Sequence, residues 1–129
     1  MSAHGAVLLV GIDPKVIDYT TGPLAGFNAE GVMQVLEAGR APFATRGLDA
    51  DMCLIDFGET AEAVLSERLS KTAYDCVVIG AGVREPRETL MLFEKIINVV
   101  RREAPQAAIA FNTNPHDSLE AALRWLPAG

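Results

Sequence analysis

Four short apolar runs recur along the chain, and a segment with helical periodicity follows each of them. Each run has the length and the Val, Ile and Leu content of a strand that is buried on both faces. The runs cover 6–12, 49–57, 74–79 and 106–112. Consecutive strands that are separated by a helix require a crossover, which makes them parallel. The alternation therefore predicts an α/β fold, a three-layer sandwich with a four-stranded parallel sheet.

The first run, 6–12, is apolar throughout, which favours a central place in the sheet. We therefore expect the flavodoxin-like strand order 2-1-3-4, within a single α/β domain that spans 1–129. Ligands of such sheets bind beyond the carboxyl ends of the strands, where the winding of the chain reverses. Here that point lies between the first and third strands, so the loops that leave these strands are candidate binding segments.

Apolar residues at helical spacing predict a helix after each strand. The predicted helices begin at Asn28 and then cover 61–71, 86–103 and 117–126. The first helix has two possible ends, a stop at Gly39 or a kink at Pro42 with continuation toward Gly47. Proline opens the third helix, and Asp117 opens the fourth with a capping-box spacing. Trp125 is expected in or near the core.

The strongest candidate site is the segment 74–86, where the third strand passes into the next helix. Its apolar run ends in Gly80-Ala81-Gly82, and Arg84 follows closely. Backbone amides at the start of a helix lack internal partners and attract anions, so this segment predicts a site for a phosphate or a carboxylate. The alternative is a tight turn that needs glycine only for its conformation.

Further polar residues follow the strand ends and would share the same edge of the sheet. As ligand-binding candidates, Gly11, Asn112 and Asn114 join Gly80, Gly82 and Arg84. His116, with Asp13 or Asp56, is a candidate for general acid and base catalysis. The alternatives are a surface histidine and carboxylates that accept hydrogen bonds from loop amides. No metal-ligand spacing, P-loop lysine or nucleophile elbow occurs in the sequence, so we expect no metal site and assign no cofactor.

Residues 13–27 form a connection much longer than the usual two to six residues, and loops of this length are often functional. We expect this loop to cover the site as a lid. The 86–103 helix carries an unusually wide apolar arc that includes Phe93 and Ile97, while Met91 falls among the polar residues beside it; an assembly surface would be centred on these three residues. This arc predicts either a helix that covers a broad sheet or a surface for homo-oligomer assembly.

Composition limits the classes of binding partner and the cellular compartment that we expect. A formal net charge of −6 argues against attraction to phosphate backbones, so neither nucleic acid nor membrane surfaces are expected as partners. No signal peptide or transmembrane span is recognisable, and we expect a cytoplasmic protein. Cys53 and Cys76 lie within apolar runs and are expected to be buried, reduced thiols.

In size and order of elements the chain resembles response-regulator receiver domains and flavodoxins. Receiver domains close their third strand with an aspartate, and Gly80 stands at that place here, so the resemblance implies no phosphoryl acceptor. Taken together, the runs 74–82 and 109–113 look like a group of small bacterial flavodoxin-like α/β proteins of unassigned function. That resemblance implies the fold and carries no activity over.

The leading expectation is a protein that binds a small anionic ligand at the carboxyl edge of its sheet, through Gly80, Gly82 and Arg84. The first alternative is a non-catalytic module for oligomerisation or protein interaction. The second is a small hydrolase or lyase that uses His116. Whether the protein is an enzyme is left open.

Overall fold

In the computed structural model, which describes residues 5–126, the strands form one parallel sheet in the order β2-β1-β3-β4. The strands are β1 (Ala6–Ile12), β2 (Asp49–Ile55), β3 (Cys76–Ile79) and β4 (Ala108–Phe111). Val7 of β1 pairs with Ala50 of β2 and with Cys76 of β3, so β1 lies inside the sheet. The predicted order is confirmed. Residues 1–4 and 127–129 of the predicted domain lie outside the described residues.

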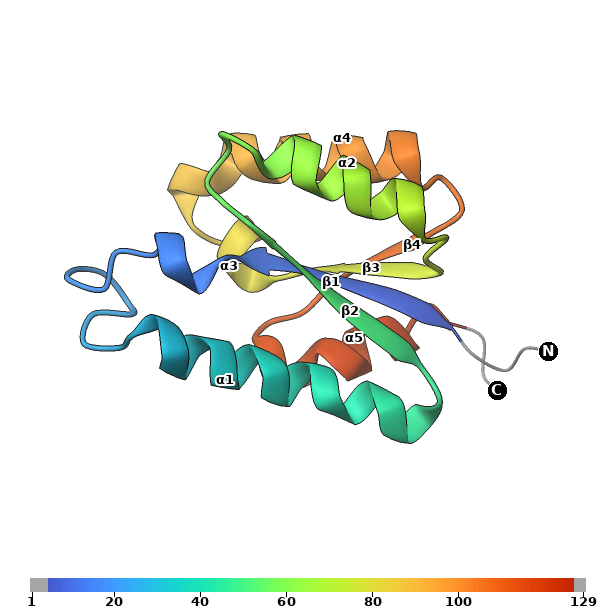
Figure 1. Cartoon of the computed structure of the whole chain (residues 1–129), viewed down its shortest axis with the longest axis horizontal. Helices are drawn as coiled ribbons and strands as arrows, with labels where there is room; N and C mark the ends of the chain where they lie inside the picture. The colour runs from blue at the N-terminus through green and yellow to red at the C-terminus, as the bar shows by residue number, and fades with distance from the viewer. Residues whose placement is uncertain (1–4, 127–129) are drawn as a thin grey trace.

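Helices cover both faces of this sheet (Figure 1). On one face lie α2 (Ala61–Lys71) and α4 (Leu90–Glu103), which also contact each other. On the other face lie α1 (Ala29–Arg40) and α5 (Ser118–Leu123). A single helical turn, α3 (Ala81–Arg84), stands at the carboxyl end of β3. The predicted three-layer α/β sandwich is thereby confirmed.

The two faces of the sheet are filled unequally. Leu8 and Val10 of β1 point into the core beneath α2 and α4, where the buried side chains of both helices interlock with them. Val7 belongs to a smaller core on the other face, and Leu9 is only half-buried there. The one buried residue of α1 is Gly39, so this helix covers its face of the sheet without filling it.

Gly39 does not end the first helix, although the sequence allowed that interpretation. A Cβ atom at Gly39 would lie 2.2 Å from the carbonyl oxygen of Pro115, so glycine is required for the close approach of η4 (Pro115–Asp117). The α-helix ends at Arg40, and the 3₁₀ helix η2 (Ala41–Arg46) carries the chain past Pro42. Gly47 caps the end of η2 with a φ of 71°, which favours glycine.

The predicted helix 86–103 begins later than expected. Pro86 has an extended conformation, with ψ at 136°, between α3 and the short 3₁₀ turn η3 (Arg87–Thr89). Because proline has no backbone N–H, α3 cannot continue through it. The Thr89 hydroxyl lies 2.6 Å from the carbonyl oxygen of Val83 and 2.9 Å from that of Pro86, which fixes the bend before α4 begins at Leu90.

Asp117 stands at the N-cap position of α5, as predicted, but its side chain makes no capping hydrogen bond to that helix. Its side chain belongs instead to a capping box with Asn114, at the start of the preceding turn η4. Asp117 accepts hydrogen bonds from the backbone N–H groups of Thr113 and Asn114. Trp125 is 60% exposed, contrary to the expected core position, because α5 ends at Leu123 and leaves it beyond the buried face.

Both cysteines are free and buried, as predicted. Burial raises the pKa of the Cys53 thiol and of the Cys76 thiol to about 11, so both stay protonated near neutral pH. Between residues 5 and 126, no helix has both the length and the apolar character needed to cross a membrane.

Candidate functional site

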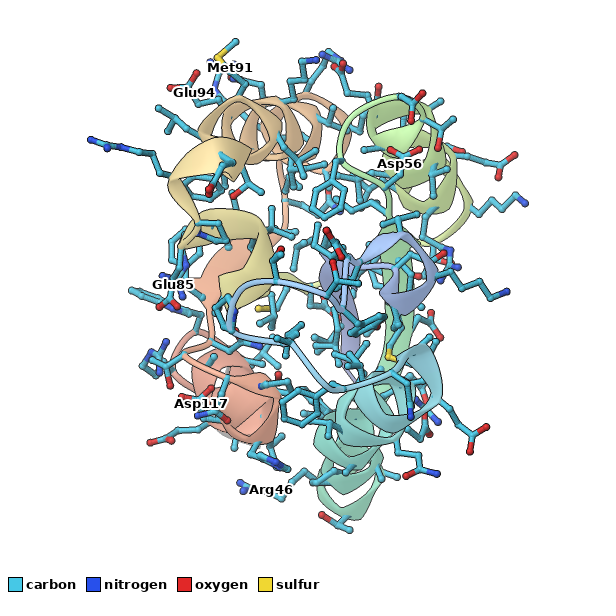
Figure 2. All side chains as sticks on the ribbon, turned by 90° about the vertical axis from the view of Figure 1, so that its left-hand side faces the viewer. Arg46, Asp56, Glu85, Met91, Glu94 and Asp117 are labelled. Carbon is cyan, nitrogen blue, oxygen red and sulfur yellow. The ribbon has the colours of Figure 1, made fainter. Side chains whose placement is uncertain are left out.

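Parallel pairing brings the exits of all four strands to one edge of the sheet, which faces the viewer in Figure 2. The loop 13–27 follows β1, and shorter connections follow the other strands. This edge is hollowed on both sides of the 13–27 loop. The candidate site therefore lies where the strand order predicted it, between the exits of β1 and β3.

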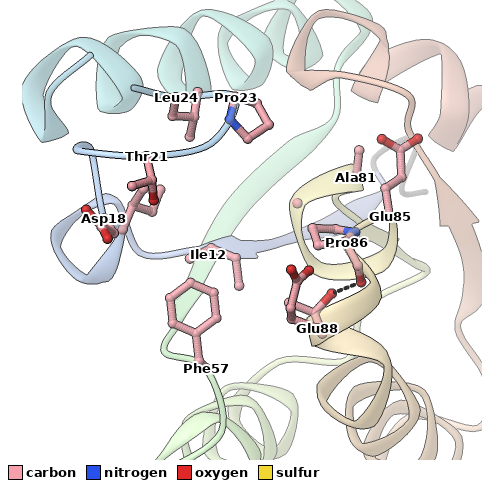
Figure 3. Close-up of a pocket in the computed structure, with 13 residues that line it drawn as sticks. Ile12, Asp18, Thr21, Pro23, Leu24, Phe57, Ala81, Glu85, Pro86 and Glu88 are labelled. Carbon is pink, nitrogen blue, oxygen red and sulfur yellow. Dashed lines mark hydrogen bonds between the residues drawn. The ribbon is translucent and has the colours of Figure 1, made fainter. Parts of the chain in front are cut away.

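The larger hollow, here called the edge cavity, has a volume of about 870 Å³. Its walls are mostly apolar and come from the ends of β1 and β2, from the 13–27 loop and from α3 with the bend that follows it (Figure 3). The principal apolar residues are Ile12, Ile17, Leu24, Phe57 and Pro86. Three carboxylates also line it, those of Asp18, Glu85 and Glu88. Among the described residues that line this cavity, none is lysine, arginine or histidine.

The second hollow, here called the inner cavity, has a volume of about 580 Å³ and lies between α1 and the sheet. Leu9, Leu36, Met52 and Leu54 are among its apolar walls. Gly11 lines it as well, and a Cβ atom built there meets no atom within 4 Å. This cavity is the space that α1 leaves unfilled above the sheet, since Gly39 is the one buried residue of the helix.

The two cavities adjoin, because six residues line both of them. These are Ile12, Ile17, Pro23, Leu24, Ala81 and Gly82. Three of the six belong to the 13–27 loop, which therefore covers the edge at the place where we expected a lid. The role of this loop as a moving lid stays a prediction.

The 13–27 loop has its own hydrogen bonds. Asp13 accepts one from the backbone N–H of Lys15 at 2.9 Å and caps the 3₁₀ turn η1 (Pro14–Val16). The Tyr19 hydroxyl donates to the Pro14 carbonyl at 2.7 Å, and the Gly26 N–H donates to the Tyr19 carbonyl at 3.1 Å. The φ of Gly26 is 87°, a value that favours glycine at this return. The carboxylate of Asp13 therefore stabilises the start of the loop.

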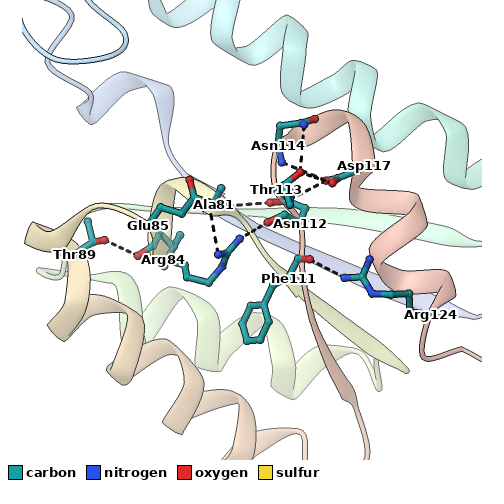
Figure 4. Close-up of polar contacts among 11 residues, drawn as sticks. Ala81, Arg84, Glu85, Thr89, Phe111, Asn112, Thr113, Asn114, Asp117 and Arg124 are labelled. Atoms are coloured by element: carbon teal, nitrogen blue, oxygen red, sulfur yellow. Dashed lines mark hydrogen bonds and ion pairs between the residues drawn. The ribbon is translucent and has the colours of Figure 1, made fainter.

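Some of the anion-binding groups predicted in 80–84 are paired within the protein (Figure 4), although the buried Nε atom of Arg84 has no hydrogen-bond partner among the described residues. The Gly80 N–H donates to the Val10 carbonyl, and the Ala81 N–H donates to the Asn112 side-chain oxygen at 2.9 Å. The Arg84 guanidinium donates to the Asn112 carbonyl and lies 5.4 Å from the centre of the Phe111 ring. Arg84 and Asn112 thus connect the exits of β3 and β4.

Asp13 and Asp56 follow neighbouring strands, and the Asp13 N–H donates to the Ile55 carbonyl at 2.8 Å, but the structure does not bring His116 beside Asp56. Asp56 accepts hydrogen bonds from the Thr60 hydroxyl at 2.7 Å and from the Gly58 N–H at 3.0 Å, at the start of α2. These bonds, led by that from the Thr60 side chain, lower the pKa of Asp56. His116 is exposed in η4, which packs against α1 on the opposite face of the sheet. In Figure 2, Asp56 and Asp117, the neighbour of His116, lie on opposite sides of the molecule.

The remaining candidates divide between the two cavities and the loops around them. Gly11, Gly80, Asn112 and Asn114 line the inner cavity, and Gly82 lines both cavities. No group of three or more His, Cys, Asp or Glu side chains within residues 5–126 is arranged to hold a metal ion.

Sequence reasoning missed the residues that give the edge cavity its character. Phe57 was assigned to the second strand, yet β2 ends at Ile55 and the Phe57 side chain is 53% exposed beside the cavity. Asp18 and Glu88 belong to no sequence motif that would have identified them as site residues. The available signal was indirect, since an aromatic residue just beyond a strand end and a long loop both point to the carboxyl edge.

In comparisons with known proteins, no family model matches the chain and no curated protein is similar to it in sequence. The resemblance to small bacterial flavodoxin-like proteins therefore stays a prediction. Any functional conclusion has to come from the geometry of the carboxyl edge.

Proposed function

We propose that this protein binds a small organic molecule with an apolar body at the carboxyl edge of its sheet. The observation that carries the proposal is the pair of adjoining cavities at the point where the winding of the chain reverses. Ligand cavities measure about 300–1,000 Å³, and they combine apolar walls with a few polar groups. The edge cavity, at about 870 Å³, fits this description.

The inner cavity supports the same proposal. Protein interiors are normally close-packed, and an unfilled apolar space forfeits the dispersion contacts that its lining could make. Leu9, Leu36 and Met52 surround such a space and are only half-buried. An apolar group that entered beneath the 13–27 loop would recover these contacts.

The anionic ligand predicted from 80–84 receives less support from this geometry. The amide of Ala81 and the guanidinium of Arg84 already donate to Asn112, and the charged groups that line the edge cavity are acidic. The hydrolase or lyase alternative needs His116 beside Asp13 or Asp56, and His116 lies across the sheet from Asp56. We therefore define the proposed ligand by its apolar body.

A neutral fluorescent probe, N-phenyl-1-naphthylamine, tests the proposal. We expect its fluorescence to rise on binding the wild-type protein and to fall back in Gly82→Phe, which fills the edge cavity. A Cβ at Gly82 meets only Ile12, at 3.9 Å, so the backbone there accepts a side chain. Ala63→Phe, on the exposed side of α2, is the matched control and should bind the probe like wild type. Equal fluorescence in all three proteins would contradict the proposal.

A second candidate function is assembly through α4, as its wide apolar arc predicted. Leu90 and Met91 are 55% and 65% exposed, whereas Phe93 and Ile97 pack against the core. If this surface mediates assembly, Met91→Glu should convert an oligomer into a monomer in size-exclusion chromatography with light scattering. Glu94→Gln, a change on the same helix, should leave the mass unaltered. A wild-type monomer, or an unchanged mass in Met91→Glu, would exclude this surface.

A further inference from the structure

We propose that the polar group of the ligand in the edge cavity is a cation, so that the ligand is an organic ammonium compound with an apolar or aromatic body. This inference rests on the proposed function and adds the charge of the ligand to it. The sequence favoured an anionic ligand, so this inference gives the ligand the opposite charge.

The charged side chains that line the cavity are all acidic. Asp18 lies on the 13–27 loop, Glu85 follows α3, and Glu88 lies in η3. Figure 3 shows Asp18 and Glu88 on opposite sides of the cavity, with Ile12 and Phe57 between them. A cation over the apolar floor would therefore face carboxylates from two separate segments of the chain.

Of the three carboxylates, only that of Glu88 lacks a partner within residues 5–126, whereas Asp18 accepts hydrogen bonds from Thr20 and Glu85 forms an ion pair with Arg84. Hydrogen bonds from Thr20 to Asp18 lower its pKa, so Asp18 is ionised at neutral pH. The Glu88 carboxylate makes no hydrogen bond or ion pair with any residue in 5–126. Glu85 lies 3.8 Å from Arg84, and its side chain is 60% exposed.

Phe57 adds a second attraction for a cation. Its side chain is 53% exposed and lines the cavity, although a phenylalanine gains by burial. The face of an aromatic ring attracts an ammonium group within about 6 Å, and it also stacks on an aromatic body. The apolar walls strengthen the attraction of a cation to the carboxylates and to the ring, because a bound ligand would displace water from these walls.

An anion would meet the opposite conditions. Arg84 is turned toward Asn112 and Phe111, and neither Arg84 nor Arg87 lines the edge cavity. However, the whole chain has a formal net charge of −6 and attracts any cation at long range. The experiment must therefore separate the cavity carboxylates from the overall charge.

Three probes with one phenyl group and different heads make this separation: 2-phenylethylammonium, 2-phenylethanol and phenylacetate. Titrations followed by NMR should show the ammonium bound about tenfold or more tightly than phenylacetate, with 2-phenylethanol between them. Glu88→Gln should weaken binding of the ammonium about two- to fivefold and leave 2-phenylethanol unchanged. Glu94→Gln changes the net charge equally on the outer side of α4 and should weaken neither probe.

The outcomes distinguish the two proposals. If phenylacetate binds as tightly as the ammonium, or if Glu94→Gln acts like Glu88→Gln, the cation inference is overturned while binding of 2-phenylethanol upholds the proposed function. If none of the three probes binds, both proposals are overturned. A salt dependence of ammonium binding that Glu88→Gln reduces and Glu94→Gln leaves unchanged, with 2-phenylethanol unaffected by salt, supports the cation inference.

Discussion

A single missing Cβ atom at Gly39 lets α1 approach the turn that precedes α5. In a helix interior, alanine is normally more stable than glycine by about 1 kcal/mol. Here the added carbon would lie 2.2 Å from the Pro115 carbonyl oxygen, and a backbone atom cannot move aside cheaply. The steric cost therefore exceeds the gain in helix propensity.

We predict that Gly39→Ala lowers the free energy of unfolding by about 1–3 kcal/mol, the usual cost of overpacking. Urea denaturation measures this change. Gly31→Ala in the same helix is the control, because its nearest neighbour is the Asn28 side-chain oxygen at 3.3 Å, which caps the helix and would have to move by only a few tenths of an ångström. Equal stability changes in the two variants would show that η4 does not constrain Gly39.

Asp56 is a second residue that stabilises only its own surroundings, at the start of α2. Its pKa is lowered mainly by the hydrogen bond from the Thr60 side chain, so the folded state holds its carboxylate more favourably than the unfolded chain does. A lowered pKa means that this stabilisation is present above the unfolded value of about 3.9 and is lost as pH falls through the folded value.

We predict that Asp56→Asn lowers the melting temperature at pH 7 and that the difference from wild type narrows below about pH 4. Thermal denaturation followed by circular dichroism over this range measures it. Glu59→Gln, in the same loop, is the matched control for the loss of one negative charge. A difference that stays constant from pH 7 to pH 3 would contradict the assigned role of Asp56.

Asn112 joins three elements at the carboxyl edge. Its side-chain oxygen accepts from the Ala81 N–H of α3, and its side-chain nitrogen donates to the Ser118 hydroxyl of α5 at 2.9 Å. Asn112 itself follows β4 and is buried. The position of α3, which lines both cavities, depends on these bonds.

We predict that Asn112→Ala lowers the free energy of unfolding by about 1–3 kcal/mol, because it leaves buried polar partners unsatisfied. Equilibrium unfolding in urea gives the value. Asn98→Ala, which removes an exposed bond to the Glu94 carbonyl, should change stability much less. If the two variants cost the same, Asn112 does not hold these elements together.

The elements also show what the sequence could and could not predict. The strands follow from continuous apolar runs: β1 was predicted with its exact bounds, and the other three were predicted one or two residues too long at one or both ends. The start of α4 was missed, because proline at a helix start and proline after a completed turn look alike in sequence. Asp117 was predicted to form a capping box with Glu120, whereas its partner is Asn114, which precedes the expected helix.

Across the whole molecule, the strand order could be predicted because chirality and burial leave few arrangements of four parallel strands. From the sequence, the candidate site could be placed at the carboxyl edge of the sheet, but the side chains that line it could not be predicted. Whether Arg84 faces a ligand or Asn112 depends on side-chain contacts between residues far apart in the sequence. The inner cavity results from how far α1 stands from the sheet, which hydrophobic periodicity does not encode.

The inner cavity implies that Gly11 is not needed for packing. We predict that Gly11→Val raises the free energy of unfolding by about 0.5–1 kcal/mol, because glycine weakens a strand interior and the added methyl groups find open space. Gly80→Ala is the contrasting variant, since its Cβ would lie 3.1 Å from the Val10 carbonyl oxygen and should destabilise the fold. Destabilisation by Gly11→Val in urea denaturation would contradict the open cavity.

The central claim is that the two cavities at the carboxyl edge receive a small molecule. A titration of ¹⁵N-labelled protein with 2-phenylethanol, followed through backbone amide shifts in NMR spectra, tests it most directly. We predict saturable shifts concentrated at Ile12, Leu24, Phe57 and Gly82, with no response around Met91. Unchanged spectra, or shifts centred on α4 or Trp125, would contradict the claim.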